Sequence, residues 1–329
     1  MDMLLLYALS FIVSAAVSLA AGFILVPMLR RMKAGQIIRE DGPVWHNKKQ
    51  GTPTMGGIMF IAGITVACLS VGILEMLEGR FGHITVLTLA IVFAAIGFVD
   101  DYVKLKKKQN LGLSAKGKFL LQLLAALGFV AIMHVAGNLT TYLYIPYIDI
   151  SFDIPIPVYY LFASFVIVGT VNSVNITDGV DGLLTGVTIP VTLCILALAY
   201  YWGHMSVGIF AAAMLGGLAM FLVFNFHPAK IFMGDTGSLF IGGAVCALAF
   251  AMDVPLLLIV LGFVYLIEAL SDIIQIFYYK ITKGKRVFKM APIHHHFELC
   301  GFSEYKLFAL FTLVSAVFAV IAFFGVYDR

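Results

Sequence analysis

The sequence predicts an all-α polytopic membrane protein with ten transmembrane helices, and two observations carry this expectation. Of its 329 residues 61% are hydrophobic and only 12% are charged, whereas a soluble domain is nearer half apolar and a quarter charged. Lysines and arginines also gather in alternate gaps between the apolar stretches. Such a chain cannot cover itself with a polar surface, which excludes soluble enzymes, disordered proteins and nucleic-acid-binding modules.

Long windows without Asp, Glu, Lys or Arg define the spans, since roughly 20 apolar residues cross the hydrocarbon core. The window 182–229 corresponds to about 72 Å of helix, enough for two spans with a turn at Gly203-His204. The window 254–267 is expected to continue past Glu268 and Asp272 to Tyr279 as one long helix. Single spans are expected in the windows 3–29, 50–74, 81–99, 119–148, 154–177, 236–252 and 305–327. We expect the whole chain, 1–329, to form a single integral membrane domain.

Positive charge sets the expected orientation. Of the 21 lysines and arginines, 19 fall in alternate gaps, and only Arg80 and Arg329 fall on the other side. Because cytoplasmic loops carry the excess of such residues, both termini are expected outside. The outer segment 142–157 alternates aromatic and β-branched residues around Pro146, which predicts a short β-hairpin. The expected cytoplasmic segments are 30–53, 103–117, 175–185, 226–238 and 280–304.

Aspartates from four segments gather at the cytoplasmic level, where a charge close to the membrane is costly and usually functional. They are Asp100, Asp101, Asp178, Asp181 and Asp235. Adjacent residues on a helix point about 100° apart, so Asp100 and Asp101 are expected to have different tasks. A solvated helix end or a lysine partner is the alternative for any one carboxylate, and it has equal weight for Glu268 and Asp272.

Glycine-rich loops accompany these aspartates. The segment 172–182 is rich in Asn, Asp and Gly, and 234–238, Gly-Asp-Thr-Gly-Ser, precedes an apolar run and is expected to be a loop that leads into a helix N-terminus. The segment 51–57 opens the second span in the same way. Oxygen ligands favour Mg²⁺ or Mn²⁺ over zinc, so the pattern predicts a divalent cation with phosphates. The position at the membrane predicts one water-soluble phosphorylated substrate and one lipid phosphate.

His294, His295 and His296 stand in a row beside several basic residues. Zinc binding is disfavoured because consecutive histidines splay apart and no spaced ligand completes a site. A solvated loop is a second alternative. The favoured interpretation is anion binding and hydrogen bonding to a substrate.

Five motifs together resemble the phospho-N-acetylmuramoyl-pentapeptide transferase family, within the polyprenyl-phosphate N-acetylhexosamine-1-phosphate transferase superfamily. The resemblance runs in order along the whole chain. The motifs are GTPTMGG (51–57), FVDDYVK (98–104), NSVNITDGVDGL (172–183), FNFHPAKIFMGDTGS (224–238) and MAPIHHHFE (290–298). The two aspartate motifs are shared across the superfamily, and the triple histidine resembles the loop of the muramoyl-pentapeptide branch.

The resemblance implies transfer of phospho-N-acetylmuramoyl-pentapeptide from its UDP-linked donor to undecaprenyl phosphate, giving lipid I and UMP in peptidoglycan synthesis. It implies a multi-pass protein of the bacterial plasma membrane, embedded in the lipid bilayer, with its active site at the cytoplasmic face, a homodimer, and a target of nucleoside antibiotics. It implies Mg²⁺ bound by Asp235, with Asp100 and Asp101 as the catalytic or phosphate-organising pair. The implied substrate-binding residues are Lys49, Thr54, Lys104, Lys116, Asn172, Asn175, Asp178, Asp181, Asn225, Gln275, His294 and His295.

Alternatives stay open at this point. Direct attack by the lipid phosphate is favoured over a covalent aspartyl intermediate, since a phosphomonoester with a second pKa of about 6 needs little help from a base. A UDP-N-acetylglucosamine-1-phosphate transferase is the nearest alternative activity, and the histidine row argues against it. A transporter should show polar residues at the bilayer midplane, whereas these lie at one level near the cytoplasm. A structural scaffold would not need acidic loops at one depth.

Overall fold

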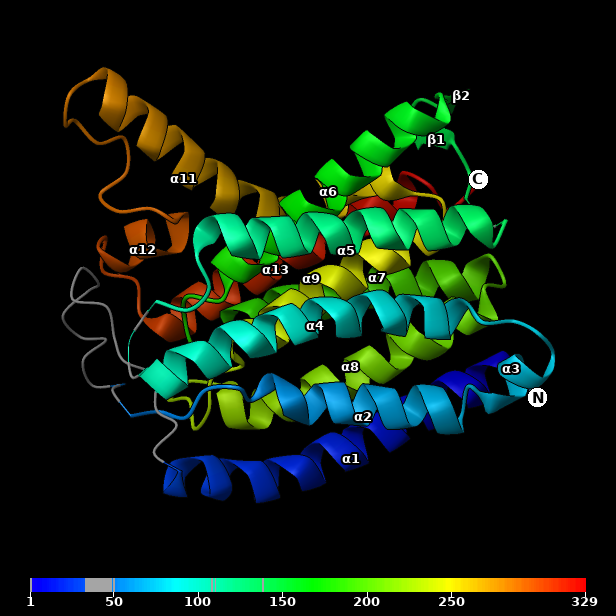
Figure 1. The fold of residues 1–329 in the computed structure, drawn as a ribbon, viewed down its shortest axis with the longest axis horizontal. Helices are drawn as coiled ribbons and strands as arrows, with labels where there is room; N and C mark the ends of the chain where they lie inside the picture. The colour runs from blue at the N-terminus through cyan, green and yellow to red at the C-terminus, as the bar shows by residue number, and fades with distance from the viewer. Residues whose placement is uncertain (1, 33–48, 50, 108, 110, 138) are drawn as a thin grey trace.

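The computed structural model describes residues 2–32, 49, 51–107, 109, 111–137 and 139–329 (Figure 1). The expected cytoplasmic segment 30–53 lies mostly outside these residues. The helices are α1 (Met3–Arg31), α2 (Gly57–Ser70), α3 (Ile73–Leu77), α4 (Gly82–Lys107), α5 (Ala115–Val135), α6 (Ile156–Thr177), α7 (Leu183–Tyr201), α8 (Met205–Asn225), α9 (Gly234–Ala251), α10 (Leu258–Leu261), α11 (Phe263–Ile281), α12 (Ile293–Glu298) and α13 (Glu304–Phe324). A 3₁₀ turn, η2 (Pro255–Leu257), precedes α10, and the strands are β1 (Tyr142–Ile145) and β2 (Ile150–Asp153).

The architecture is that of a polytopic helical membrane protein. Among the described residues, eight helices are long and apolar enough to cross a bilayer, or nine if the bent pair Pro255–Leu261 and Phe263–Ile281 counts as one span. Helix α2 is apolar but has only 14 residues. The number of ten spans therefore remains a prediction.

The expectation of one continuous helix from 254 to 279 is wrong. Helix α10 ends at Leu261 and α11 begins at Phe263, with Gly262 between them, and the two parts are bent by 79°. Pro255, at the start of η2, has no backbone N–H, and glycine at the junction weakens the helix. The bend lets α11 project away from the bundle (Figure 1).

Helix α9 forms the centre of the bundle and packs against α4 on one side and α6 on the other (Figure 1). Small residues permit the close approach: a Cβ added at Gly242 would lie 2.7 Å from the Val171 Cα of α6. A Cβ at Gly57, the first residue of α2, would lie 2.3 Å from the Gly237 Cα. In the spanning window of α9, 83% of the residues are buried, against 28% in α1 and α13. Helix α9 is thus closely packed by its neighbouring helices, including at its start.

A two-stranded antiparallel hairpin lies in the segment where one was expected, with Tyr142 opposite Asp153 and Ile145 opposite Ile150. The backbone N–H of Tyr147, in its turn, donates to the Gly325 carbonyl oxygen at 3.1 Å, which ties the hairpin to the end of α13. The start of α1, the end of α13 and the hairpin all lie at the end of the bundle opposite α12 (Figure 1). Which side of the membrane this end faces remains a prediction.

Candidate functional site

The acidic site forms where the last turns of α4 meet the first turn of α9. We define it by Asp100, Asp101, Lys104, Lys118 and Asp235. One oxygen from each of the three carboxylates lies within 4.8 Å of the others. Gly97 permits this approach, since a Cβ there would lie 2.1 Å from the Asp235 carbonyl oxygen.

Asp101 is buried and holds the start of α9. Its carboxylate accepts hydrogen bonds from the backbone N–H groups of Asp235, at 3.1 Å, and Thr236, at 2.9 Å. It also accepts one from the Thr236 hydroxyl, at 2.7 Å. The first N–H groups of a helix have no partner within the helix, so this carboxylate satisfies them from outside. Asp101 therefore positions Asp235.

Asp100 points instead toward the lysines. Its Oδ2 lies 2.6 Å from Lys104 Nζ, and its Oδ1 accepts a hydrogen bond from the Leu113 N–H at 2.8 Å. Lys104 Nζ and Lys118 Nζ lie 2.8 Å and 2.7 Å from Asp235 Oδ2. The adjacent aspartates thus have different surroundings, in keeping with the expectation of two different tasks.

The end of α6 adds amide and carboxyl groups to the acidic site. Asn175 Nδ2 donates to Asp235 Oδ1 at 2.9 Å and to Ser238 Oγ at 2.7 Å. Asp178, just after α6, has its carboxyl pKa raised to about 8, chiefly by loss of solvation and then by the charge of Asp235. Asn172 points elsewhere and donates to Gln122 Oε1 at 2.7 Å.

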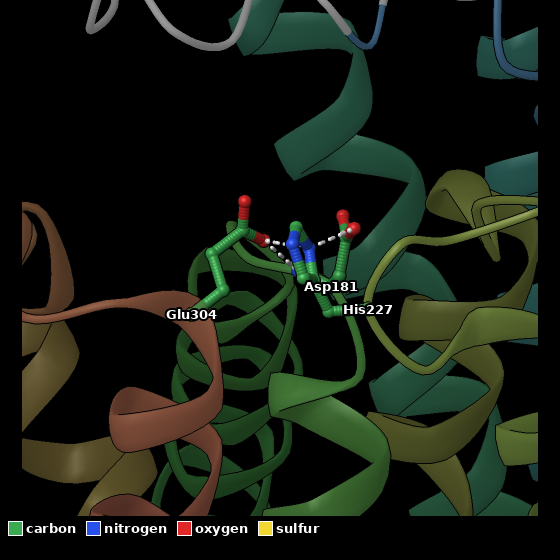
Figure 2. A group of neighbouring side chains, drawn as sticks. All are labelled: Asp181, His227 and Glu304. Carbon is green, nitrogen blue, oxygen red and sulfur yellow. Dashed lines mark hydrogen bonds and ion pairs between the residues drawn. The ribbon is translucent and has the colours of Figure 1, made fainter.

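A second group, the Lys49 cluster, consists of Lys49, Asp181, His227 and Glu304. Lys49 Nζ lies 2.7 Å from Asp181 Oδ1 and 2.6 Å from Glu304 Oε2. Figure 2 shows the His227 ring between the two carboxylates, and its Nδ1 lies 3.0 Å from Asp181 Oδ2. Three carboxylate and imidazole ligands of this kind can bind a metal, but here the Lys49 ammonium already supplies the positive charge.

The histidine row forms the short helix α12. His294 is buried, and its Nδ1 lies 2.9 Å from Glu268 Oε2 on α11. His295 Nδ1 lies 2.6 Å from Glu298 Oε2. A Cβ at Gly179 would lie 2.1 Å from His294 Nε2, so this ring lies directly against the Asp178–Gly179 turn. The row therefore joins α11 to the acidic side of the bundle.

Two predicted residues, Gln275 and Asn225, hold backbone segments in place, and a third, Thr54, is buried. Gln275 Oε1 accepts from the N–H groups of Val287 and Phe288, at 3.0 Å and 3.1 Å. Asn225 Oδ1 accepts from the Gly182 N–H at 3.1 Å. Thr54 is buried, and a Cβ at Gly234 would lie 2.8 Å from its Oγ1.

The sequence predicted Lys116 as a site residue, but this side chain is exposed, and the lysine of α5 that contacts Asp235 is Lys118. Ser114 is the N-cap of α5 and accepts from the Gly117 N–H at 3.2 Å, so a capping signal in the sequence marks where this helix begins. Glu268, His227 and Glu304 were missed as partners because they contact site residues from distant segments.

The acidic site fits a hard divalent cation. It offers carboxylate and amide oxygens, and three carboxylates face two lysines, Lys104 and Lys118, which leaves one negative charge uncompensated. Asp101 accepts from the backbone at the start of α9 with both oxygens, whereas every partner of Asp235 is a side chain and Asp100 Oδ2 contacts lysines, so Asp235 and Asp100 are the residues best placed to bind such an ion.

Comparison with known proteins gives the family. Residues 83–253, which include α4 and α9, match Glycosyl transferase family 4, and residues 49–61 match signature 1 of phospho-N-acetylmuramoyl-pentapeptide-transferase. A phospho-N-acetylmuramoyl-pentapeptide-transferase of Desulforamulus reducens is 45% identical over 319 residues, which cover 96% of this chain and 94% of that protein. The chain belongs to the phospho-N-acetylmuramoyl-pentapeptide-transferase family.

Other members of the family are similarly close. The protein of that name from Bacillus subtilis is 43% identical over 309 residues, covering 92% of each chain. The one from Clostridium acetobutylicum is 42% identical over 316 residues, covering 95% of this chain and 97% of the relative. The family signature includes Lys49 and Thr54, and the broader match includes all three aspartates of the acidic site, whereas His294 and Glu304 lie outside both.

Proposed function

We propose that this protein transfers phospho-N-acetylmuramoyl-pentapeptide from its UDP-linked donor to undecaprenyl phosphate and releases UMP. The observation that carries the proposal is the similarity to relatives of that name along more than nine-tenths of the chain. The acidic site and the Lys49 cluster supply the groups that a reaction between two anionic substrates requires.

We assign the divalent cation, Mg²⁺, to Asp235 and Asp100. When bound, Mg²⁺ supplies positive charge that lets two phosphate-bearing substrates approach each other. Lys104 and Lys118 hold the Asp235 carboxylate at 2.8 Å and 2.7 Å, and Asn175 fixes its other oxygen. Asp101 fixes the backbone of Asp235, so the Asp235 carboxylate has one defined position before any substrate binds.

The chemistry follows as a direct displacement. An oxygen of the lipid phosphate forms a bond to the sugar-bearing phosphorus of the donor, the bond from that phosphorus to the UMP oxygen breaks, and UMP leaves with the electron pair. A phosphomonoester is mostly deprotonated at pH 7, since its second pKa is about 6, so no strong general base is required. Lys104 and Lys118 stabilise the negative charge at the acidic site, and no aspartyl intermediate is formed.

We place the donor across both groups of residues. The diphosphate lies near the acidic site and Lys49, and the sugar-peptide lies toward His294 and His295 of α12. The remaining assignments follow the family: the active site faces the cytoplasm of a bacterial cell, and the protein forms a homodimer in the plasma membrane.

The test is a transfer assay with the purified protein in detergent, given UDP-N-acetylmuramoyl-pentapeptide and undecaprenyl phosphate. We expect UMP release with Mg²⁺, none with EDTA, and a lipid product of matching mass. Asp235→Asn should lower turnover at least 100-fold, because an amide is a weaker ligand for a hard cation. Release with UDP-N-acetylglucosamine alone would assign the protein to the sister activity, and an active Asp235→Asn variant would contradict the cation assignment.

A further inference from the structure

We infer that Glu304 is a positioning residue that holds the Lys49 ammonium in place for the nucleotide-sugar donor. The inference rests on the proposed function, and it gives a role to a carboxylate outside every matched motif. Glu304 lies in the first turn of α13, capped by Ser303, whose hydroxyl accepts from the Lys306 N–H at 3.4 Å.

The Glu304 carboxylate joins three other segments through one oxygen. Its Oε2 lies 2.6 Å from Lys49 Nζ, accepts the Asp181 N–H at 3.2 Å and lies 3.4 Å from His227 Nδ1. Asp181 completes the frame, since its Oδ2 accepts the Ala229 N–H at 2.9 Å and lies 3.0 Å from His227 Nδ1. A carboxylate only accepts hydrogen bonds, so His227 carries its proton on Nδ1 here.

These contacts restrict the Lys49 side chain, which is otherwise flexible. Lysine carries its charge on a four-carbon stem with many rotamers, and a site that has ordered it in advance avoids that entropy cost on binding. An ammonium has three N–H donors, and among the described residues two are used by Asp181 and Glu304. One N–H is left to donate to an acceptor atom of the donor substrate, with its direction fixed by the other two.

The residue next to Glu304 offers a control that distinguishes this role from a general role in folding. Glu304 is next to Tyr305, whose hydroxyl donates to the His227 carbonyl oxygen at 3.1 Å and whose ring lies edge-on to the His227 ring, 5.0 Å away. Tyr305 thus joins α13 to the same loop but does not contact Lys49. It provides a matched control for the loss of a loop contact.

The test measures KM and kcat for UDP-N-acetylmuramoyl-pentapeptide in the full-length protein. Ordering one such side chain corresponds to a factor of about two to ten, so Glu304→Ala should raise the donor KM about fivefold. The kcat and the KM for undecaprenyl phosphate should stay within about twofold. Tyr305→Phe should leave the donor KM unchanged.

A double-mutant cycle with Lys49→Met decides the mechanism. In that background Glu304→Ala should have no further effect on the donor KM, because the ammonium it orders is gone. Equal effects in both backgrounds, or an unchanged KM in Glu304→Ala and in the isosteric Glu304→Gln, would overturn the inference. An inactive wild-type protein would instead contradict the proposed function, so the two failures are distinguishable.

Discussion

At the scale of single residues, the two adjacent aspartates at the end of α4 divide positioning from chemistry. Asp101→Asn should lower the free energy of unfolding by about 1–3 kcal/mol, because an amide cannot accept all the bonds donated by the start of α9. Asp100→Asn should lower kcat at least 100-fold and change the melting temperature little. Thermal unfolding in detergent and the UMP assay measure both. Equal losses of stability in the two variants would contradict the division.

The neighbouring lysines at the start of α5 form a natural matched pair. Lys118→Ala should reduce kcat/KM at least tenfold, because it removes the charge 2.7 Å from Asp235 Oδ2. Lys116→Ala, on the exposed side of the same turn, should retain at least half of the wild-type value. Steady-state kinetics of the two variants checks this, and a larger loss in Lys116→Ala than in Lys118→Ala would show that Lys116 acts at the site.

At the scale of elements, the α4–α9 contact depends on a glycine. Gly97→Ala places a methyl group where the Asp235 carbonyl oxygen lies 2.1 Å away, so the helices must separate and both stability and turnover should fall. Gly128→Ala on α5 is the control, since no neighbour lies within 4 Å of its added Cβ. It should be neutral or stabilising by up to about 1 kcal/mol. Melting temperatures and UMP release measure both variants, and a Gly97→Ala protein as stable and active as wild type would show that the contact is not tight.

The elements also show how far the sequence alone reaches. Apolar windows and turn signals predicted the helical class and the Gly203-His204 turn, whereas α9 begins at Gly234, at the start of the segment expected to be a loop. The break at Gly262 was missed because the apolar residues continue across it, and hydrophobicity alone does not show where a helix bends. Asp100, Asp101 and Asp235 converge as their shared level in the chain predicts, but Asp181 lies in the Lys49 cluster, and Glu304 reaches Lys49 only through folding of distant segments.

At the scale of the whole molecule, cysteine accessibility tests orientation. Of the four cysteines, Cys68, Cys194 and Cys246 are buried and Cys300 is exposed, next to α12. If the α12 end faces the cytoplasm, an impermeant maleimide should label inverted membrane vesicles but not intact spheroplasts. Cys300→Ser should remove the signal in the inverted vesicles. Labelling of spheroplasts would reverse the assigned orientation.

The enclosure of α9 has a consequence for biosynthesis. Of the eight candidate spans, α9 has the lowest mean hydropathy and the largest buried share, so lipid alone is a poor environment for it. Its partners α4 and α6 precede it in the chain and leave the ribosome first. Nascent α4 and α6 can therefore receive α9 as it enters the bilayer, and Asp235 finds its acidic neighbours already in the membrane.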